Sequence, residues 1–458
     1  MTTLLPNGPA TPAIVQTLQW IISPISLMEA CAKQYGDIFT LKLDEPIVFV
    51  SHPQALQQIL TRDTQDLEAP GEPLFEPLLG TQSVITLSGQ PHWRQRQLLM
   101  PPFHGERMRT YGEVIAKVTQ EIISQWQPNI PFCVRTAMQA ITLRVIMQAV
   151  FGLYDSPRAQ KIEEILSLIL DANGSSVLRA FMLYFPILQK DLGPLSPWGT
   201  FLRRREQVKK LIYEEIQQRQ KQNDPSRTDV LSLLLTARDE NDQPMTQQQL
   251  HDELITLLIA GHETTATALT WALYWIHKLP AVRKKLLQEI GQLGNNLDHN
   301  SIAKLPYLNA VCCETLRIYP VGMVTFPRIV KTPISMCGYQ LPTGTTVMGC
   351  IYLTHHREDL YPQPKQFRPE RFLEKQFSPY EYLPFGGGVK RCIGMAFAQF
   401  EMKVVLANIL SRWELALTDN RDVQPKRRGL VTGPNRSIQM VVKSQRQVDF
   451  LSLHSVGG

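Results

Sequence analysis

Long apolar runs are missing from this sequence of 458 residues. The most apolar stretch near its start covers residues 13–30, and Gln16, Gln19 and Pro24 interrupt it. A stretch this short and this polar cannot span a bilayer as a helix. No basic segment precedes it, so a secretory signal peptide is not indicated either. We therefore expect a cytoplasmic protein without a transmembrane anchor.

Cysteine is also scarce, with 7 residues at irregular spacing. An odd number without a regular pattern does not favour a disulfide framework and indicates a reducing compartment. No Cys or His partner lies near Cys392 at the spacing of a zinc site. The net charge of +6 is scattered, so nucleic-acid binding is not indicated, although a local concentration of it would suit an acidic protein partner.

What is present is the composition of a folded protein, with 43% hydrophobic and 19% charged residues. There is no internal repeat and no low-complexity segment, and we expect residues 1–458 to form a single domain. Residues 105–222 have the periodicity of successive amphipathic helices. Residues 37–43 and 46–50 are typical of a β-hairpin, and Ser51 is placed to cap the helix that follows.

The most unusual stretch runs from Leu383 to Phe397 and reads LPFGGGVKRCIGMAF. Its three successive glycines, Gly386 to Gly388, permit backbone conformations and close approaches that other residues do not. Cys392 follows Lys390 and Arg391 and stands just before a periodic helix, and both features stabilise a thiolate. Such a cysteine suits a nucleophile or the single protein ligand of a metal, while a buried structural cysteine is the simpler alternative.

A second unusual stretch is the helix predicted from Thr246 to Lys278, which is apolar on nearly all sides. It begins with TQQQ, a capping box. Its middle, residues 260–265, reads AGHETT, although glycine costs about 1 kcal/mol relative to alanine in a helix. One interpretation is a kink in which Thr264 bonds back to the Ala260 carbonyl. The other is a functional site, because broken local rules often mark one.

Two pairs of polar residues have helical spacing. His92 and Arg96 are four residues apart, hence on one face of a predicted helix, and Trp93 is expected to pack against the protein. Glu314 and Arg317 are three residues apart with apolar neighbours. Either pair could lie on a solvated surface, but apolar flanks favour burial of the second pair, which then needs further partners.

Taken together, these features resemble the cytochrome P450 monooxygenase family. Residues 385–394 are similar to the haem-binding loop of the family, in which the cysteine thiolate is the axial ligand of the haem iron. Residues 260–265, the Glu314–Arg317 pair and residues 367–372 (FRPERF) match further motifs of the family in the same order. One position departs, because Lys390 stands where arginine is usual and keeps the charge without bidentate hydrogen bonding.

The resemblance implies a set of site residues. Cys392 is the implied metal ligand, and Thr264 and Glu263 are the implied catalytic pair that bonds to oxygen and supplies protons. The implied cofactor-binding residues are Cys392, His92, Arg96, Arg328, Lys390 and Phe385. Glu314, Arg317 and Arg371 are expected to form a buried charge network that supports the cysteine loop.

The implied fold is mainly α with a small β region built from residues 37–50, residues 323–351 and the C-terminal segment. The implied cofactor is haem b, which activates O₂ with two electrons and oxidises a substrate C–H bond. No flavin or iron–sulfur domain is recognised, so a ferredoxin or flavodoxin with its reductase should supply the electrons. We expect a soluble, bacterial-type monomer whose basic docking face includes Arg94, Lys390 and Arg391.

The expected substrate pocket is apolar, so we expect a hydrophobic substrate. Its expected lining residues are Phe75, Leu78, Leu79, Val84, Ile85, Leu257, Ala260, Met323 to Phe326, Leu430 and Val431. The motifs are most similar to the bacterial branch that hydroxylates long-chain fatty acids and related lipids. However, Pro46 and Val50 stand where an arginine and a tyrosine hold the carboxylate in a hydroxylase of that branch, so terpenoid or polycyclic lipids are the alternative.

Two other classes of function fit the same cysteine loop. One is a haem-thiolate peroxygenase or isomerase that does not use O₂, but such enzymes often lack the Glu263 and Thr264 pair that is retained here. The other is a non-catalytic haem sensor or carrier. Substrate-dependent consumption of NAD(P)H with reconstituted partners would separate the monooxygenase from the sensor.

Overall fold

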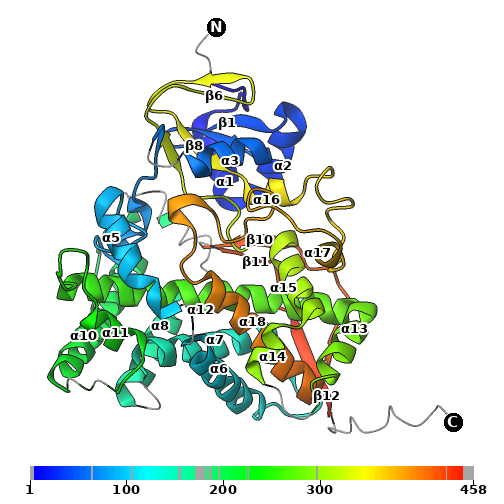
Figure 1. The fold of residues 1–458 in the computed structure, drawn as a ribbon. Coiled ribbons are helices and arrows are strands. Elements are labelled where there is room, and N and C mark those ends of the chain that lie inside the picture. Colours follow the sequence, from blue (N-terminus) through cyan, green and yellow to red (C-terminus); the bar gives the residue numbers. More distant parts are fainter. Residues whose placement is uncertain are drawn as a thin grey trace.

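Long α-helices account for most of the fold (Figure 1). The computed structural model describes residues 5–446, apart from residues 63–64, 104, 106, 153–155, 171–180, 183–184, 186–187, 194–195, 223, 225, 295–297 and 430. The described α-helices are α1 (Ala13–Ile22), α2 (Pro24–Tyr35), α3 (Pro53–Thr61), α4 (Glu76–Leu79), α5 (Gly89–Leu99), α6 (Arg107–Ile123), α7 (Val134–Phe151), α8 (Pro157–Leu170), α10 (Pro197–Gln222), α11 (Val230–Thr236), α12 (Gln247–Lys278), α13 (Pro280–Gly291), α14 (His299–Ala303), α15 (Pro306–Ile318), α16 (Ile351–His355), α17 (Arg371–Glu374) and α18 (Met395–Arg412).

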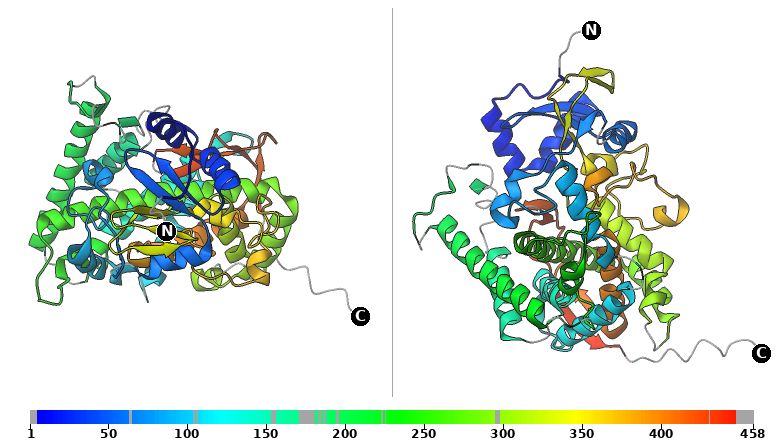
Figure 2. Two further views of the ribbon diagram at one scale, coloured as in Figure 1. Left: turned by 90° about the horizontal axis from the view of Figure 1, so that it is seen from above. Right: turned by 60° about the vertical axis from the view of Figure 1, so that its left-hand side comes forward.

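The strands are short and form small sheets. They are β1 (Ile38–Lys42), β2 (Pro46–Val50), β3 (Leu67–Glu68), β4 (Pro131–Cys133), β5 (Arg328–Val330), β6 (Ile334–Met336), β7 (Tyr339–Leu341), β8 (Thr346–Gly349), β9 (Trp413–Leu417), β10 (Pro425–Arg428), β11 (Val431–Pro434) and β12 (Gln439–Gln445). The largest sheet has the order β1-β2-β8-β5-β3. Figure 1 and the right-hand view of Figure 2 show this sheet with α1 to α3 at one end of the helical part. The predicted mainly α fold with a small β region is confirmed.

The predicted β-hairpin is confirmed by the antiparallel pair β1 and β2. Phe39 pairs with Phe49 across it, and their rings stack with centroids 5.6 Å apart. The predicted cap of the next helix is wrong, because α3 begins later than expected. Its N-cap is His52, whose Nδ1 accepts a hydrogen bond of 3.3 Å from the Gln54 N–H, whereas Ser51 lies one residue further out.

The second part of the β region is less regular than the sequence indicates. Of residues 323–330, which belong to the predicted β region, only β5 is a strand. Pro327 has no N–H and ends the ladder at that point. Thr325 still donates its N–H to the Gly349 carbonyl at 2.8 Å, so the segment follows the sheet edge without joining it regularly.

Helix α12 runs through the centre of the molecule and packs against α7, α10, α15 and α18. Its predicted capping box is present, since the Thr246 side chain accepts from the Gln249 N–H and the Gln249 side chain accepts from the Thr246 N–H. Gly261 has a packing role in this helix, because a Cβ there would lie 2.8 Å from Ile146 Cδ1 of α7. The glycine therefore lets the two helices approach closely.

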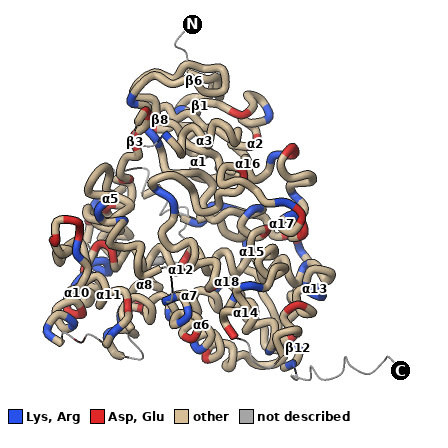
Figure 3. Tube along the Cα trace, in the orientation of Figure 1, with Lys and Arg blue, Asp and Glu red and all other residues tan. Residues whose placement is uncertain are grey.

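Charges of both signs are interspersed along the described chain (Figure 3). No large segment of a single sign stands out in that view, in agreement with a modest net charge. Within the described ranges, no helix is both long and apolar enough to cross a membrane.

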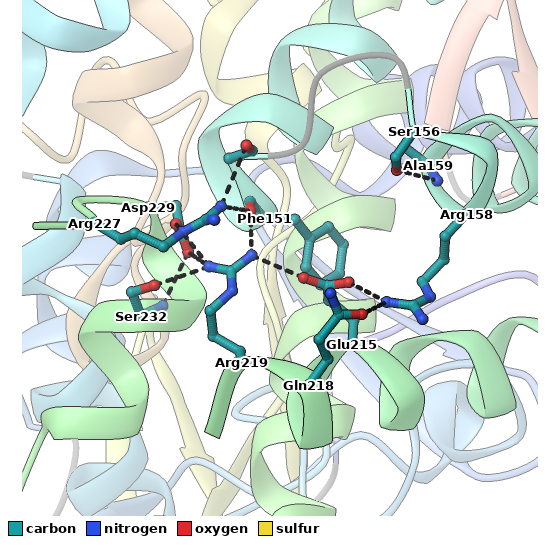
Figure 4. A network of polar contacts seen from close by, with 11 residues as sticks. Phe151, Ser156, Arg158, Ala159, Glu215, Gln218, Arg219, Arg227, Asp229 and Ser232 are labelled. Carbon is teal, nitrogen blue, oxygen red and sulfur yellow. Dashed lines mark hydrogen bonds and ion pairs between the residues drawn. The ribbon is translucent and has the colours of Figure 1, made fainter. Parts of the chain in front are cut away.

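A buried ion network fixes the C-terminal half of α10 (Figure 4). Arg219 donates to Asp229 at 2.8 Å, to Glu215 at 2.8 Å and to the Phe151 carbonyl at 2.7 Å. Arg158 of α8 donates to the other oxygen of Glu215 at 2.6 Å. The network therefore joins α7, α8, α10 and the start of α11, and it contains none of the predicted site residues.

Candidate functional site

The glycines before Cys392 are required by the backbone of their loop. Gly386 and Gly388 have φ values of 66° and 64°, a conformation that L side chains rarely adopt. A Cβ at Gly387 would lie 2.7 Å from Leu60 Cδ1 of α3. The loop therefore needs all three glycines for the reasons the sequence indicated, two for conformation and one for close approach.

Cys392 lies at the end of this loop, and its N–H donates to the Phe385 carbonyl at 3.0 Å. The residue is exposed, yet enough protein surrounds the thiol to desolvate it. Burial raises the pKa of the Cys392 thiol, while the Gly394 N–H, Arg96 and Arg391 lower it. Since the pKa stays raised overall, the residues around Cys392 supply only part of the stabilisation that a thiolate needs.

A cluster of cations gathers next to the cysteine loop. The pKa of His92 is lowered to about 4 by burial and by Lys390, Arg96 and Arg328. Arg328 is fully buried and donates to the Gly387 carbonyl at 3.3 Å, which ties β5 to the glycine loop. The structure therefore brings together four residues that the sequence placed in one site, from α5, β5 and the loop.

Lys390 occupies this cluster in a specific way. Its ammonium donates to the Leu87 carbonyl at 2.6 Å and to the Val84 carbonyl at 3.4 Å. Lys390 is buried, so these carbonyls belong to the environment that compensates its charge. This contact could not be predicted from the sequence, because 303 residues separate Lys390 from Leu87.

The middle of α12 presents an accessible face within a mostly buried helix. Ala260 is exposed, and Leu257, Gly261 and Thr264 are half-buried. These positions follow the i, i+3, i+4, i+7 spacing of one helix face. Thr264 Oγ1 donates to the Ala260 carbonyl at 2.6 Å, so the bond of the kink interpretation is present. The same hydroxyl lies on the accessible face, as the functional interpretation requires.

Glu263 points away from this face, toward α7. Its carboxylate pairs with Arg135 and accepts a hydrogen bond of 2.9 Å from Gln139. Arg135 and Gln139 are four residues apart on α7, a spacing visible in the sequence, but nothing in it indicates their partner on α12. The adjacent His262 is buried and contacts Thr142 at 3.0 Å through Nδ1, which gives it a packing role.

The predicted charge network around Glu314 is confirmed. Arg317 donates to both carboxylate oxygens of Glu314 at 2.6 and 2.9 Å, and Arg371 donates to one of them at 3.1 Å. All three side chains are at most 4% exposed. Arg317 also donates to the His355 carbonyl at 2.7 Å, so the network reaches α16.

The proposed basic docking face is smaller than predicted. Arg94 pairs with Asp239 and also donates to the Pro244 carbonyl at 3.2 Å, so it holds the segment before α12. Lys390 is buried, and only Arg391 of the three is exposed. The expectation for Trp93 is also wrong, because it is 44% exposed on α5.

Several of the predicted pocket residues lie at accessible positions. Phe75 and Phe326 are half-buried and meet edge to face with ring centroids 6.5 Å apart. Ile85 is also half-buried, whereas Val84 is buried. Leu430 lies outside the described residues. The residues predicted to line an apolar pocket therefore include accessible apolar side chains.

Comparisons with known proteins agree with this geometry. Residues 6–441 match the family model described as Cytochrome P450. The chain is 34% identical to cytochrome P450 135B1 of Mycobacterium tuberculosis over 99% of this chain and 94% of that one. It is 32% identical to cytochrome P450 135A1 of the same species over 98% of both. Its fold matches the cyanobacterial CYP120A1, solved with retinoic acid bound, with a TM-score of 0.84 and 25% identity, covering 97% of this chain and 100% of that one. The chain therefore belongs to the cytochrome P450 family and is a monooxygenase whose cofactor is haem b.

Proposed function

We propose that this chain holds haem b through Cys392 and hydroxylates an apolar lipid, with long-chain fatty acids as the first candidate. The residues present fit the cofactor. Cys392 is accessible, and the Gly394 N–H, Arg96 and Arg391 favour its thiolate, which a bound iron would stabilise further. A cluster of cations beside it suits the carboxylates of the haem. Haem supplies the iron at which O₂ is activated and the substrate is oxidised.

Different residues of the chain would bind the iron and the propionates of the haem. Cys392 Sγ would ligate the iron, and the Gly394 N–H would orient that sulfur. Arg96, Arg328 and His92 would hold the propionates. Lys390 would add positive charge to the same cluster, and Phe385 would fix the loop through its carbonyl, which accepts from the Cys392 N–H at 3.0 Å.

Thr264 and Glu263 would deliver the protons that the reaction consumes. The Thr264 hydroxyl lies on the accessible face of α12 and can both donate and accept a hydrogen bond. Glu263 is 14% exposed and is held by Arg135, so its carboxylate would take part only after a change of partner. Glu263 would therefore deliver protons from the α7 side, and Thr264 would hold the last proton donor in place.

The accessible apolar side chains among the predicted pocket residues support a hydrophobic substrate. Retinoic acid, bound in the cyanobacterial relative, is an isoprenoid chain that ends in a carboxylate. This relative favours terpenoid acids as the second candidate. The names of the mycobacterial relatives give no substrate.

A spin-state titration tests the substrate proposal. Fatty acids of increasing length should bind more tightly with each added methylene, by at most about 0.8 kcal/mol per methylene. Retinoic acid serves as the isoprenoid comparison. A flat response across the fatty-acid series together with tight retinoic acid binding would replace the fatty-acid proposal by the terpenoid one.

The redox partner is proposed to be a ferredoxin or flavodoxin, and the chain to act as a monomer of one domain. Arg391 is the exposed cation next to the cysteine loop and would contact an acidic donor. Electron transfer should slow with added salt, and Arg391→Glu should slow it further. Arg94→Glu is a poor test of docking, because Arg94 holds Asp239. If neither added salt nor Arg391→Glu changes the rate of electron transfer, this surface does not dock the redox partner.

A further inference from the structure

The peptide group of Val84 is held from both sides. Its N–H donates to Glu253 Oε1 of α12 at 2.8 Å. Its carbonyl accepts from Lys390 Nζ of the cysteine loop at 3.4 Å, and the same ammonium donates to the Leu87 carbonyl at 2.6 Å. The segment from residue 82 to residue 87 is thus tied at one end to α12 and at the other to the loop that carries Cys392.

Further bonds from α12 strengthen the first of these ties. Asp252 Oδ2 accepts from the Gln82 N–H at 2.9 Å, and Thr256 Oγ1 donates to Ser83 Oγ at 2.8 Å. Gly80 permits this approach, because a Cβ there would lie 2.3 Å from the Asp252 carboxylate. A cluster of polar side chains one turn before the accessible face of α12 therefore serves a single short segment.

Glu253 is chemically unusual within this cluster. It is fully buried, and its Oε2 has no hydrogen-bond partner among the described residues. Burial raises the pKa of Glu253 well above its ordinary value, although the Val84 N–H and Lys390 lower it. Burial therefore favours the neutral form of Glu253, and its Oε1 accepts from the Val84 N–H whether or not the group carries a charge.

An accessible apolar side chain, Ile85, directly follows the tied peptide group of Val84. Ile85 is half-buried and packs against the main hydrophobic core, and its carbonyl accepts from the Glu72 N–H at 3.2 Å. Leu257 and Ala260, on the accessible face, follow Glu253 by four and seven residues, which places them about 6 and 10 Å further along α12. The position of Ile85 relative to that face depends on the bonds at Val84.

We propose that Glu253 and Lys390 are positioning residues that fix residues 82–87 as one wall of the substrate site and thereby set the chain length of the substrate it accepts. This proposal rests on the proposed function for its substrate. This role explains why lysine stands at position 390, since its single compact ammonium donates to two carbonyls of the segment.

The test compares Glu253→Gln with Glu253→Leu in the haem-loaded protein. Glutamine keeps a carbonyl acceptor for the Val84 N–H without a charge, whereas leucine removes the acceptor at similar size. Hydrogen exchange of the Val84 amide should be about tenfold faster in Glu253→Leu and close to wild type in Glu253→Gln, the change expected for one hydrogen bond. This readout does not depend on activity.

The second readout is the dependence of fatty-acid binding on chain length, measured by spin-state titration. Glu253→Leu should flatten this dependence and raise KM more than it lowers kcat, with haem content and the CO spectrum unchanged. Glu253→Gln should keep the wild-type dependence. Lys390→Met should flatten it as well and should also increase exchange at residues 84–87.

Three outcomes would overturn the proposal. Equal Val84 exchange in Glu253→Leu and wild type would show that the bond does not hold the segment. Loss of chain-length dependence in Glu253→Gln would show that a charge on Glu253 is what matters. Faster exchange with unchanged chain-length dependence would show that the segment does not form the wall. If wild-type protein binds no fatty acid, the proposed substrate fails, and the same comparison is made with retinoic acid and shorter isoprenoid acids.

Discussion

His355 Nε2 accepts a hydrogen bond of 3.0 Å from the Leu383 N–H. Leu383 is the first residue of the loop that ends at Cys392, and the His355 carbonyl accepts from Arg317 at 2.7 Å. His355 therefore connects the Glu314 network to the cysteine loop. Its ring stacks on Tyr382 with centroids 5.5 Å apart, which fixes its orientation.

His355→Phe should weaken the cysteine loop, because the ring stacking is retained while the buried Leu383 N–H loses its acceptor. The expected loss of stability is about 1–3 kcal/mol. Reduced protein with CO should show a larger share of the form without thiolate ligation. His356→Phe is the matched control, since the His356 ring contacts Tyr352 one turn earlier and makes no hydrogen bond to the cysteine loop within the described part of the chain. Equal CO spectra for both variants would contradict this role of His355.

Glu314→Ala should leave two buried guanidinium groups without their carboxylate. Breaking a buried ion network of this kind costs about 3–5 kcal/mol. We expect low haem content and a lower urea midpoint. Glu164→Ala removes the exposed partner of Lys161 and should change little. Wild-type haem content and stability in Glu314→Ala would be incompatible with the network's role.

Thr264→Ala should still bind substrate and accept electrons. Because the hydroxyl on the accessible α12 face is lost, a larger share of those electrons should appear as peroxide and a smaller share as product. Thr264→Ser keeps a hydroxyl and should retain most of the coupling. The ratio of peroxide to product per NAD(P)H measures this directly, and an unchanged ratio in Thr264→Ala would leave the residue with a packing role only.

Several buried or half-buried histidines, among them His262 and His355, should make the protein sensitive to acid. Burial and Arg135 lower the pKa of His262 to about 4, and burial and Arg317 hold the pKa of His355 well below 6.5. The unfolded chain takes up these protons near pH 6.5 and the folded chain does not, so stability is complete above about pH 7 and falls toward pH 4.

Each of these histidines contributes a slope of at most about 1.4 kcal/mol per pH unit. Urea unfolding at a series of pH values measures the slope, and His262→Gln should reduce it. Constant stability between about pH 7 and pH 5 would contradict the assignment of both histidines as neutral.

The sequence contained enough information for the elements whose signals are local. The capping box at Thr246, the apolar periodicity of α12 and the glycines of the cysteine loop are short-range features, and the structure has each of them where expected. The Glu314 network was predictable through family motifs, because both of its arginines lie in such motifs.

What could not be predicted depends on pairs of distant residues. Glu263 was expected to supply protons, but the sequence did not indicate its partner Arg135, which lies 128 residues earlier on α7. Arg94 was expected on a docking face, and Asp239, 145 residues later, holds it instead. His355 was expected to brace a loop, but the sequence did not indicate that its partner is the Leu383 N–H. Glu253 was missed, because a glutamate in an apolar helix does not reveal which distant backbone N–H it accepts from.

The CO spectrum of the reduced protein tests the central claim, that Cys392 is the thiolate ligand of the haem. Cys133→Ser is the control, because Cys133 is a second cysteine whose thiolate is favoured. Burial raises the pKa of its thiol, but hydrogen bonds from Ser437 and Thr136 lower it overall. The account predicts the red-shifted Soret band of thiolate ligation in wild type and Cys133→Ser and its loss in Cys392→Ser. A normal red-shifted band in Cys392→Ser would contradict it.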